Sequence, residues 1–283
     1  MKDVVVGVDG SPASLAAVVW ATDDAVRSGA SLRVVFVLNR DPYQITRFDP
    51  GLGDQLARGA ERVLEEAERA ARARDRDVAV TTRVLEGRPS EVLRSQAAEA
   101  AELVVGTRGM GGFARLVVGS VSMHVAGHAP GPVVVVPQTA FAPKGEVVAG
   151  VDDTPECLPA LAYAFEQAAR RGATLRALHA WEPPVYPFAP DIAYDAEQTR
   201  TDRQTAVAGL LAKGRAEYPG VRVIEDVRRG HPVEALAAAS ERADLLVIGS
   251  HGRGALTAAV LGSVSRGVLH HAKCPVAVVR PRD

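Results

Sequence analysis

Short runs of valine and leucine alternate along the chain with longer stretches in which apolar residues recur at helical spacing. In the first half, the short runs predict strands at 4–8, 32–38, 78–85, 103–105 and 133–136. The stretches between them predict helices at 13–28, 55–74, 91–101 and 120–129. Strands that alternate with helices and are apolar on both faces predict an α/β fold with a parallel sheet.

The whole pattern returns at an offset of 143 residues. Gly7-Val8-Asp9 returns as Gly150-Val151-Asp152, and Gly119-Ser120-Val121-Ser122 returns as Gly262-Ser263-Val264-Ser265. A repeat of this length indicates two duplicated domains and not a solenoid. We expect the first domain over residues 1–140 and the second over residues 144–283, with a short join that holds them close together.

Composition narrows the functional classes. Hydrophobic residues make up 47% of the chain and charged residues 24%, with 33 basic and 34 acidic side chains, as in globular proteins. A net charge of -1 provides no basic field for nucleic acid. The two cysteines are too few for a disulfide framework, and no apolar run approaches the length of a membrane span. We therefore expect a cytoplasmic protein with neither a nucleic-acid nor a membrane partner.

Candidate chemistry follows the first and fourth predicted strands, because ligands of open α/β sheets lie beyond the carboxyl ends of the strands. The first strand ends at Asp9, and Gly106-Thr107-Arg108-Gly109 is followed after nine residues by Gly119-Ser120. The second half has Gly249-Ser250-His251-Gly252 and, after nine residues, Gly262-Ser263. Glycines let the backbone approach a ligand, and a helix that begins at the serine offers free N–H groups to a phosphate.

The local charge agrees with a phosphate ligand. Residues 103–145 and 245–282 contain no Asp or Glu, so a polyphosphate would meet no repelling carboxylate from either segment. Glycine-rich, acid-poor loops also occur without a ligand, and Asp9 and Asp152 could be turn or cap residues. We favour nucleotide binding because the motif stands in the required strand-loop-helix context in both halves.

The pattern G-x2-G-x9-G-[ST], together with an Asp that ends the first strand, resembles the ATP-binding branch of the universal stress protein family. The resemblance covers almost the whole chain twice. It implies two tandem doubly wound, Rossmann-like domains, each a five-stranded parallel sheet in the order 3-2-1-4-5 with helices on both faces. It also implies one ATP site per domain, with Mg²⁺ on the phosphates, and a nucleotide-dependent role in stress sensing or signalling.

The same resemblance assigns roles to positions. It places Asp9 and Asp152 near the nucleoside, puts Val37 and Ala180 against adenine, and lines the ribose and phosphates with the glycine loops and helix starts. The expected binding residues of the first domain are Gly7, Val8, Asp9, Val37, Gly106, Arg108, Gly109, Gly119, Ser120, Val121 and Ser122. Those of the second domain are Gly150, Val151, Asp152, Ala180, Gly249, His251, Gly252, Gly262, Ser263, Val264 and Ser265.

The two sites are not identical in sequence. Phe36 precedes the adenine position of the first domain, whereas His179 precedes that of the second, so equal affinity is left open. The segments after each second strand, 39–53 and the stretch from Trp181 onward, are the least repeated parts of the chain. At the ligand end of the sheet they are either covers of the site or ordinary loops.

Other readings fit the sequence less well. A dinucleotide fingerprint over residues 109–114 lacks the acidic residue that would bind the ribose, and the chain has neither a P-loop nor a G-x-S-x-G elbow. His270, His271 and Cys274 are spaced as metal ligands could be, but the first repeat does not preserve them. Cys157, near a helix start, has Ser14 as its counterpart and is more simply a small first-turn residue.

No catalytic residue is predicted, because phosphoryl transfer needs a positioned base that the acid-free segments do not supply. We expect ATP hydrolysis to be very slow at most. A slow ATP-dependent hydrolase or transferase, and an interaction protein with vestigial sites, are the alternatives. The fifth strands should lie at the sheet edges and pair within the chain as an intramolecular pseudo-dimer, and two chains could form a homodimer.

Overall fold

The computed structural model describes residues 2–39, 50–109, 118–139, 142–183, 195–251 and 261–282. The chain divides into two compact units. The first consists of Met1–Phe141, Ala259–Leu261 and Ala277–Asp283, and the second consists of Ala142–Ala258 and Gly262–Val276.

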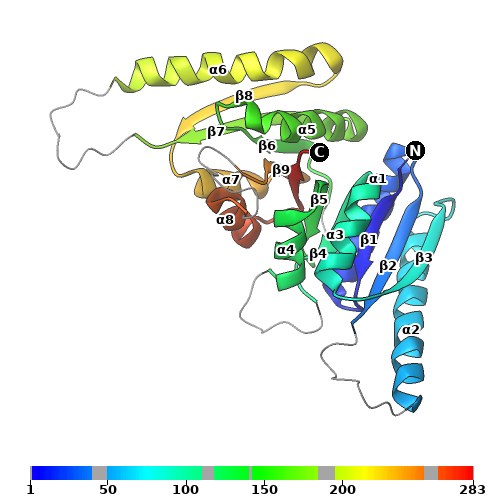
Figure 1. Cartoon of the computed structure of the whole chain (residues 1–283). Helices are drawn as coiled ribbons and strands as arrows, with labels where there is room; N and C mark the ends of the chain where they lie inside the picture. Colours follow the sequence, from blue (N-terminus) through cyan, green and yellow to red (C-terminus); the bar gives the residue numbers. More distant parts are fainter. Residues whose placement is uncertain are drawn as a thin grey trace, which may run out of the picture. The chain divides into compact units, whose positions relative to one another are not determined.

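The first repeat alternates strands and helices from end to end (Figure 1). Its elements are β1 (Val4–Val8), α1 (Pro12–Ser28), β2 (Leu32–Leu38), α2 (Pro50–Arg74), β3 (Val80–Glu86), α3 (Pro89–Glu99), β4 (Glu102–Gly106), α4 (Ser120–His128) and β5 (Gly131–Val136). The strands follow the order β3-β2-β1-β4-β5. β1 lies between β2 and β4 and is parallel to both, with Val4 opposite Leu32 on one side and Glu102 on the other.

The second repeat has the same sequence of elements. They are β6 (Glu146–Gly150), a short 3₁₀ turn (Pro155–Cys157), α5 (Leu158–Arg171), β7 (Thr174–Trp181), α6 (Ala196–Glu217), β8 (Val223–Arg229), α7 (Pro232–Ser240), β9 (Leu245–Gly249), α8 (Ser263–His271) and β10 (Val276–Arg280). Its strands follow the order β8-β7-β6-β9-β10, and β6 is parallel to β7 and β9. The predicted tandem α/β fold with the sheet order 3-2-1-4-5 is confirmed.

Several boundaries differ from those expected from the sequence, most of them by one or two residues. α2 begins at Pro50 and not at residue 55, and β3 begins at Val80 and not at residue 78. Glycines at positions 51 and 53 weaken the helical signal of the first turn of α2. Val78 is buried although it precedes the strand, so its apolar side chain is explained by packing alone.

The first helix, α1, is capped at both ends and packs on the sheet through small side chains. The Ser11 side chain caps α1 by accepting a hydrogen bond from the Ser14 N–H at 3.2 Å, and Gly29 ends the helix with a left-handed φ of 68°. α1 packs on β1 and β4 and beside α2, while α3 packs against α4. The fully buried Ala17, Ala21 and Ala25 recur every four residues, so α1 presents a face of small side chains.

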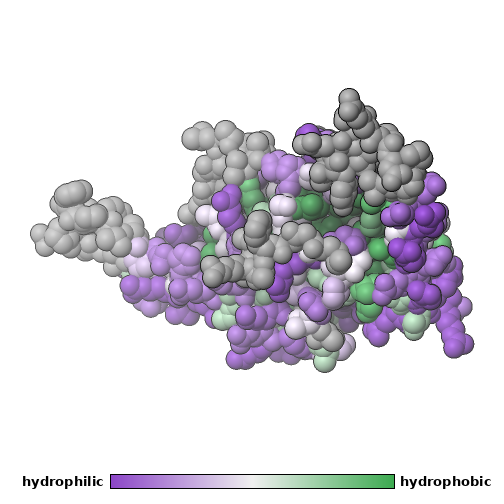
Figure 2. All heavy atoms as spheres, turned by 90° about the horizontal axis from the view of Figure 1, so that it is seen from below, coloured by the Kyte–Doolittle hydropathy of each residue, from purple (hydrophilic) through white to green (hydrophobic). Residues whose placement is uncertain are grey.

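Burial follows position in each sheet. β1, β4 and β5 are buried almost throughout, as parallel strands covered on both faces should be, whereas β3 and β8 are largely exposed. Hydrophilic residues dominate the face seen in Figure 2, and hydrophobic residues form smaller patches on it. No helix within the described ranges is long and apolar enough to cross a bilayer.

Two glycines of α6 provide an internal test of the packing. A Cβ on Gly214 would lie 2.2 Å from Cε2 of the buried Phe165, whereas a Cβ on Gly209 would meet nothing within 4 Å. Gly214→Ala should therefore destabilise the protein by about 1–2 kcal/mol because the Phe165 ring must move. Gly209→Ala, the matched control, should stabilise it by about 0.5–1 kcal/mol through helix propensity. Denaturant unfolding of both variants decides this, and equal effects would contradict the packing of α6 on α5.

Candidate functional site

The turn after β1 holds the first predicted ligand group, Asp9. Its carboxylate accepts a hydrogen bond from the Ser11 N–H at 3.0 Å. The Ser11 hydroxyl in turn donates to the carbonyl of Arg108 at 3.0 Å, which ties this turn to the loop after β4. Two segments about a hundred residues apart in sequence are thus held together at the carboxyl end of the sheet.

Gly106 and Gly109 are required by the protein itself. A Cβ on Gly109 would lie 2.2 Å from Oδ2 of Asp9, and a Cβ on Gly106 would lie 2.6 Å from the carbonyl carbon of Ala13 in α1. Any larger residue would push the loop away from Asp9 or the strand away from the helix. The sequence explained these glycines by ligand approach, whereas the structure gives them a packing role.

Gly119 at the start of α4 is different. Its φ of -73° is open to any residue, and the nearest atom to an added Cβ is the Thr107 carbonyl oxygen at 3.5 Å, an ordinary contact. Neither the backbone nor the packing demands a glycine there. No side chain among the described residues caps the helix, and Ser120, the first helical residue, is exposed. The first turn of α4 therefore presents N–H groups that no described side chain caps.

Ser122 fastens the same helix to the sheet. It is buried, and its hydroxyl donates to the carbonyl of Gly106, the last residue of β4, at 2.6 Å. Because its proton is used in this bond, the hydroxyl that stays available to donate to a ligand at this helix start is that of Ser120.

The second domain repeats this arrangement. Gly262 begins α8 with a φ of -59°, no side-chain cap and 3.4 Å between an added Cβ and the Ser250 carbonyl oxygen. Ser263 is exposed, while the buried Ser265 donates to the carbonyl of Gly249 at 2.7 Å. Two domains of different sequence thus build the same uncapped helix start against the end of the fourth strand.

The acidic turn of the second domain is bonded differently. Oδ1 of Asp152 accepts from both the N–H and the hydroxyl of Thr154, at 3.2 and 2.7 Å. In the first domain, Ser11 instead directs its hydroxyl to the loop after β4. The carboxylate of Asp152 is consequently held by the residues of its own turn.

His251 occupies the position of Arg108. Its Nδ1 lies 2.9 Å from the Ser250 hydroxyl, and its Nε2 is buried without a hydrogen-bond partner among the described residues. Arg108, by contrast, is exposed. Gly252 and most of the two segments after the second strands lie outside the described residues.

The remaining predicted residues surround these features. Val37 and Ala180 are half-buried near the ends of β2 and β7, and Val8 and Val151 are buried beside the acidic turns. Gly7, Gly150, Val121 and Val264 are half-buried, and the two valines are the second residues of α4 and α8. Added Cβ atoms on Gly7 and Gly150 would come within 3.0 Å of Leu93 and Ile248 side chains, so these glycines serve packing.

Sequence reasoning missed a charged cluster in the second domain. The Arg203 guanidinium of α6 pairs with Asp153 at 2.9 Å and lies over the Trp181 ring, 5.4 Å from its centroid. Arg203 also lies 3.4 Å from Nε2 of His179, whose Nδ1 bonds the Val151 carbonyl at 2.8 Å. Burial, the largest cause, and the charge of Arg203 lower the pKa of His179 below its usual range, although the bond to Val151 opposes this shift.

Neither cysteine is an activated thiol. Burial, followed by the charge of Asp152, raises the pKa of Cys157 to about 12. Burial likewise raises the pKa of Cys274 to about 12, and its thiol lies 3.4 Å from the carbonyl of Pro275. A thiol with such a pKa stays protonated at neutral pH, so both side chains act as small buried groups.

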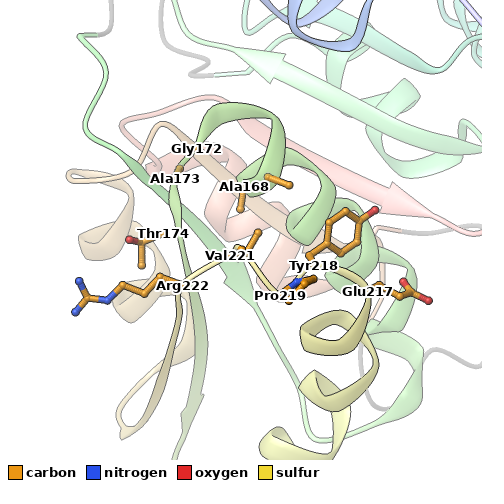
Figure 3. A pocket seen from close by; sticks show the side chains of 11 residues that line it. Ala168, Gly172, Ala173, Thr174, Glu217, Tyr218, Pro219, Val221 and Arg222 are labelled. Carbon is orange, nitrogen blue, oxygen red and sulfur yellow. The ribbon is translucent and has the colours of Figure 1, made fainter.

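A surface hollow of about 450 Å³ lies in the second domain at the end of the sheet opposite the acidic turn. It is lined by the end of α5 and by the residues that lead into β7 and β8, including Gly172, Thr174, Tyr218 and Arg222. In Figure 3 the side chains of Tyr218 and Arg222 extend away from each other. The hollow is therefore at the amino ends of these strands and is separate from the acidic turns and helix starts.

The fold and this site define a class: tandem parallel α/β domains, each with an acidic turn after its first strand and an uncapped helix start after its fourth. The model of the universal stress protein family matches residues 1–137 and 145–280. The chain belongs to the universal stress protein family, with two such domains in tandem.

Similar proteins share this tandem organisation. Universal stress protein Rv1996 of Mycobacterium tuberculosis is 34% identical over 303 residues, covering 99% of this chain and 96% of its own length. Universal stress protein Rv2005c of the same organism is 36% identical over 293 residues, covering 98% and 96%. The crystal structure of a universal stress protein from Archaeoglobus fulgidus aligns over the full length of both chains with a TM-score of 0.74 at 23% identity, which supports the fold.

Proposed function

We propose that each domain binds one adenine nucleotide, ATP with Mg²⁺, and that the protein acts as a cytoplasmic sensor or signalling protein in a nucleotide-dependent stress response. Adenine would lie between the ends of the first two strands, near Val37 or Ala180. The ribose would lie by Asp9 or Asp152. The phosphates would cross the glycine loop to the start of α4 or α8.

The observation that carries this proposal is the pair of uncapped helix starts at Gly119 and Gly262. Each glycine lacks a Cβ although neither its φ nor its packing requires this. A phosphate that approaches the first-turn N–H groups would need that space, and the helix dipole favours its negative charge there. The exposed hydroxyls of Ser120 and Ser263 stand beside these N–H groups as further donors.

Binding, and not turnover, is the proposed activity. Asp9 and Asp152 are engaged by hydrogen bonds from their own turns. The acid-free segments add no carboxylate that could orient an attacking water. The protein would therefore respond to the nucleotide by occupancy.

The duplication supplies the test. Wild-type protein should bind two ATP per chain in a calorimetric titration, while Gly119→Val and Gly262→Val should each remove one site because a branched side chain fills the space of the phosphate. The losses should be nearly additive, since the sites lie in separate domains. The double variant should bind none while its far-UV circular dichroism stays unchanged.

Gly220→Val is the matched control, because a Cβ on Gly220 meets nothing within 4 Å and this residue lies at the end of the second sheet opposite the acidic turn. It should keep both sites. Full stoichiometry in the Gly119→Val, Gly262→Val double variant would refute the assignment of these glycines. Unfolding of that variant would refute the claim that the glycines serve the ligand alone.

We also propose that the fifth strands of the two domains pair within the chain as a pseudo-dimer. Their sequences are almost wholly apolar, and each ends the strand order of its own domain. An unpartnered apolar edge is an aggregation hazard that proteins avoid by covering it.

Hydrogen exchange tests this pairing. The amides of residues 133–136 and 276–279 should exchange as slowly as those of the central strands β1 and β6, because both sides of each fifth strand would be hydrogen-bonded. Exchange as fast as that of the exposed edge strands β3 and β8 would contradict it. Gel filtration across a concentration series then shows whether two chains also dimerise.

A further inference from the structure

The cluster around Arg203 lies at the end of the second sheet that the nucleotide proposal assigns to the base. His179 and Trp181 flank Ala180, the residue expected against adenine, and Asp153 directly follows Asp152, the residue expected against the nucleoside. Arg203 comes from α6, the helix that follows the segment after β7. One guanidinium thus joins three structural elements around the expected base position.

The hydrogen-bond directions in the cluster are determined by its chemistry. The Val151 carbonyl can only accept, so Nδ1 of His179 carries the proton and Nε2 of the neutral ring is an acceptor. That acceptor faces the N–H of Arg203, whose other contact is the Asp153 carboxylate. The lowered pKa of His179 keeps the ring in this neutral form at neutral pH.

The cluster is well enclosed. The side chains of Arg203 and Asp153 are only 21% and 14% exposed, and His179 and Trp181 are buried. An ion pair so shielded from water is stronger than one on the surface, and the planar guanidinium also stacks on the indole ring. The cluster therefore restrains the turn that carries Asp152.

The first domain has no charged, histidine or tryptophan side chain at the three positions that correspond to Asp153, His179 and Trp181. The repeat puts Gly10 where Asp153 stands, Phe36 where His179 stands and Leu38 where Trp181 stands. The helix residue that reaches this turn is Val63, with its Cγ2 3.0 Å from the place of a Cβ on Gly10. Gly10, with a φ of 85°, thus stands at the position that Asp153 occupies in the second domain.

We propose that Arg203 is a positioning residue of the second nucleotide site, which clamps the turn of Asp152 and so strengthens nucleotide binding there. This inference rests on the proposed nucleotide binding. Arg203 acts through Asp153, Trp181 and His179. Because it holds the turn in place before the ligand binds, less conformational entropy is lost on binding.

Single-site chains allow the test. With the first site disabled by Gly119→Val, ATP binding reports the second site alone. Adding Arg203→Val, which removes the guanidinium, should weaken this site about tenfold. The same substitution in the Gly262→Val chain should leave the first site unchanged.

Further variants separate positioning from simple support of the fold. Asp153→Gly should also weaken the second site, and the loss in the double variant should be less than the sum of the two single losses, because both substitutions break the Arg203–Asp153 pair. Arg203→Lys should restore part of the affinity, since it keeps the charge but loses the planar stacking. Melting temperatures measured without ATP report the structural effect separately.

The outcomes are distinct. Two ATP sites in the wild type with a second site unaffected by Arg203→Val would overturn the clamp and leave the nucleotide proposal standing. A lower melting temperature with unchanged affinity would assign Arg203 to the fold alone. Absence of ATP binding in the wild type would overturn the proposed function and this inference with it.

Discussion

A single hydrogen bond, made twice, determines where the candidate sites lie. In each domain a buried serine in the first turn of the helix after the fourth strand donates to the carbonyl of the last residue of that strand, at 2.6 Å for Ser122 and 2.7 Å for Ser265. The bond fixes the start of the helix at the carboxyl edge of the sheet, where ligands of open α/β sheets bind. In the first domain, Gly119 at this helix start lies near Gly109, and Gly109 lies against Asp9.

The duplication conserves this arrangement and varies what surrounds it. Both domains keep the glycine before the helix and the serine that holds the helix to the strand. They differ in the acidic turn, where Ser11 bonds the loop after β4 but Thr154 bonds Asp152. They differ again in the cluster of Arg203, which has only apolar counterparts in the first domain. One chain thus combines two candidate sites that share the same helix start and differ in the residues around the acidic turn.

Much of this fold could be predicted because its central strands are buried on both faces and therefore read as uninterrupted apolar runs. The start of α2 could not, because its glycines are typical of a loop, and β3 lies at an exposed edge where burial leaves a weaker pattern. The glycine motif predicted ligand approach at Gly106 and Gly109, and the structure adds a packing role for both, against Ala13 and Asp9. Sequence alone does not distinguish backbone approach to a ligand from approach to another segment.

Arg203 was missed for a related reason. A charged residue on a helix is typical of a solvent-facing position, and only the fold brings Arg203 to Asp153, some fifty residues earlier. The exchange of Phe36 for His179 was a visible signal of asymmetry, and the structure supplies its partner. Long-range charge pairs of this kind need the tertiary arrangement before they can be recognised.

The most direct test of the phosphate sites is hydrogen exchange at the two helix starts with and without ATP. The first-turn amides around Ser120–Ser122 and Ser263–Ser265 lack intrahelical acceptors, so they should exchange readily in the free protein and slow strongly when a phosphate accepts their hydrogen bonds. The account predicts ATP-dependent protection at both places. Binding of ATP that leaves both helix starts unprotected would contradict it.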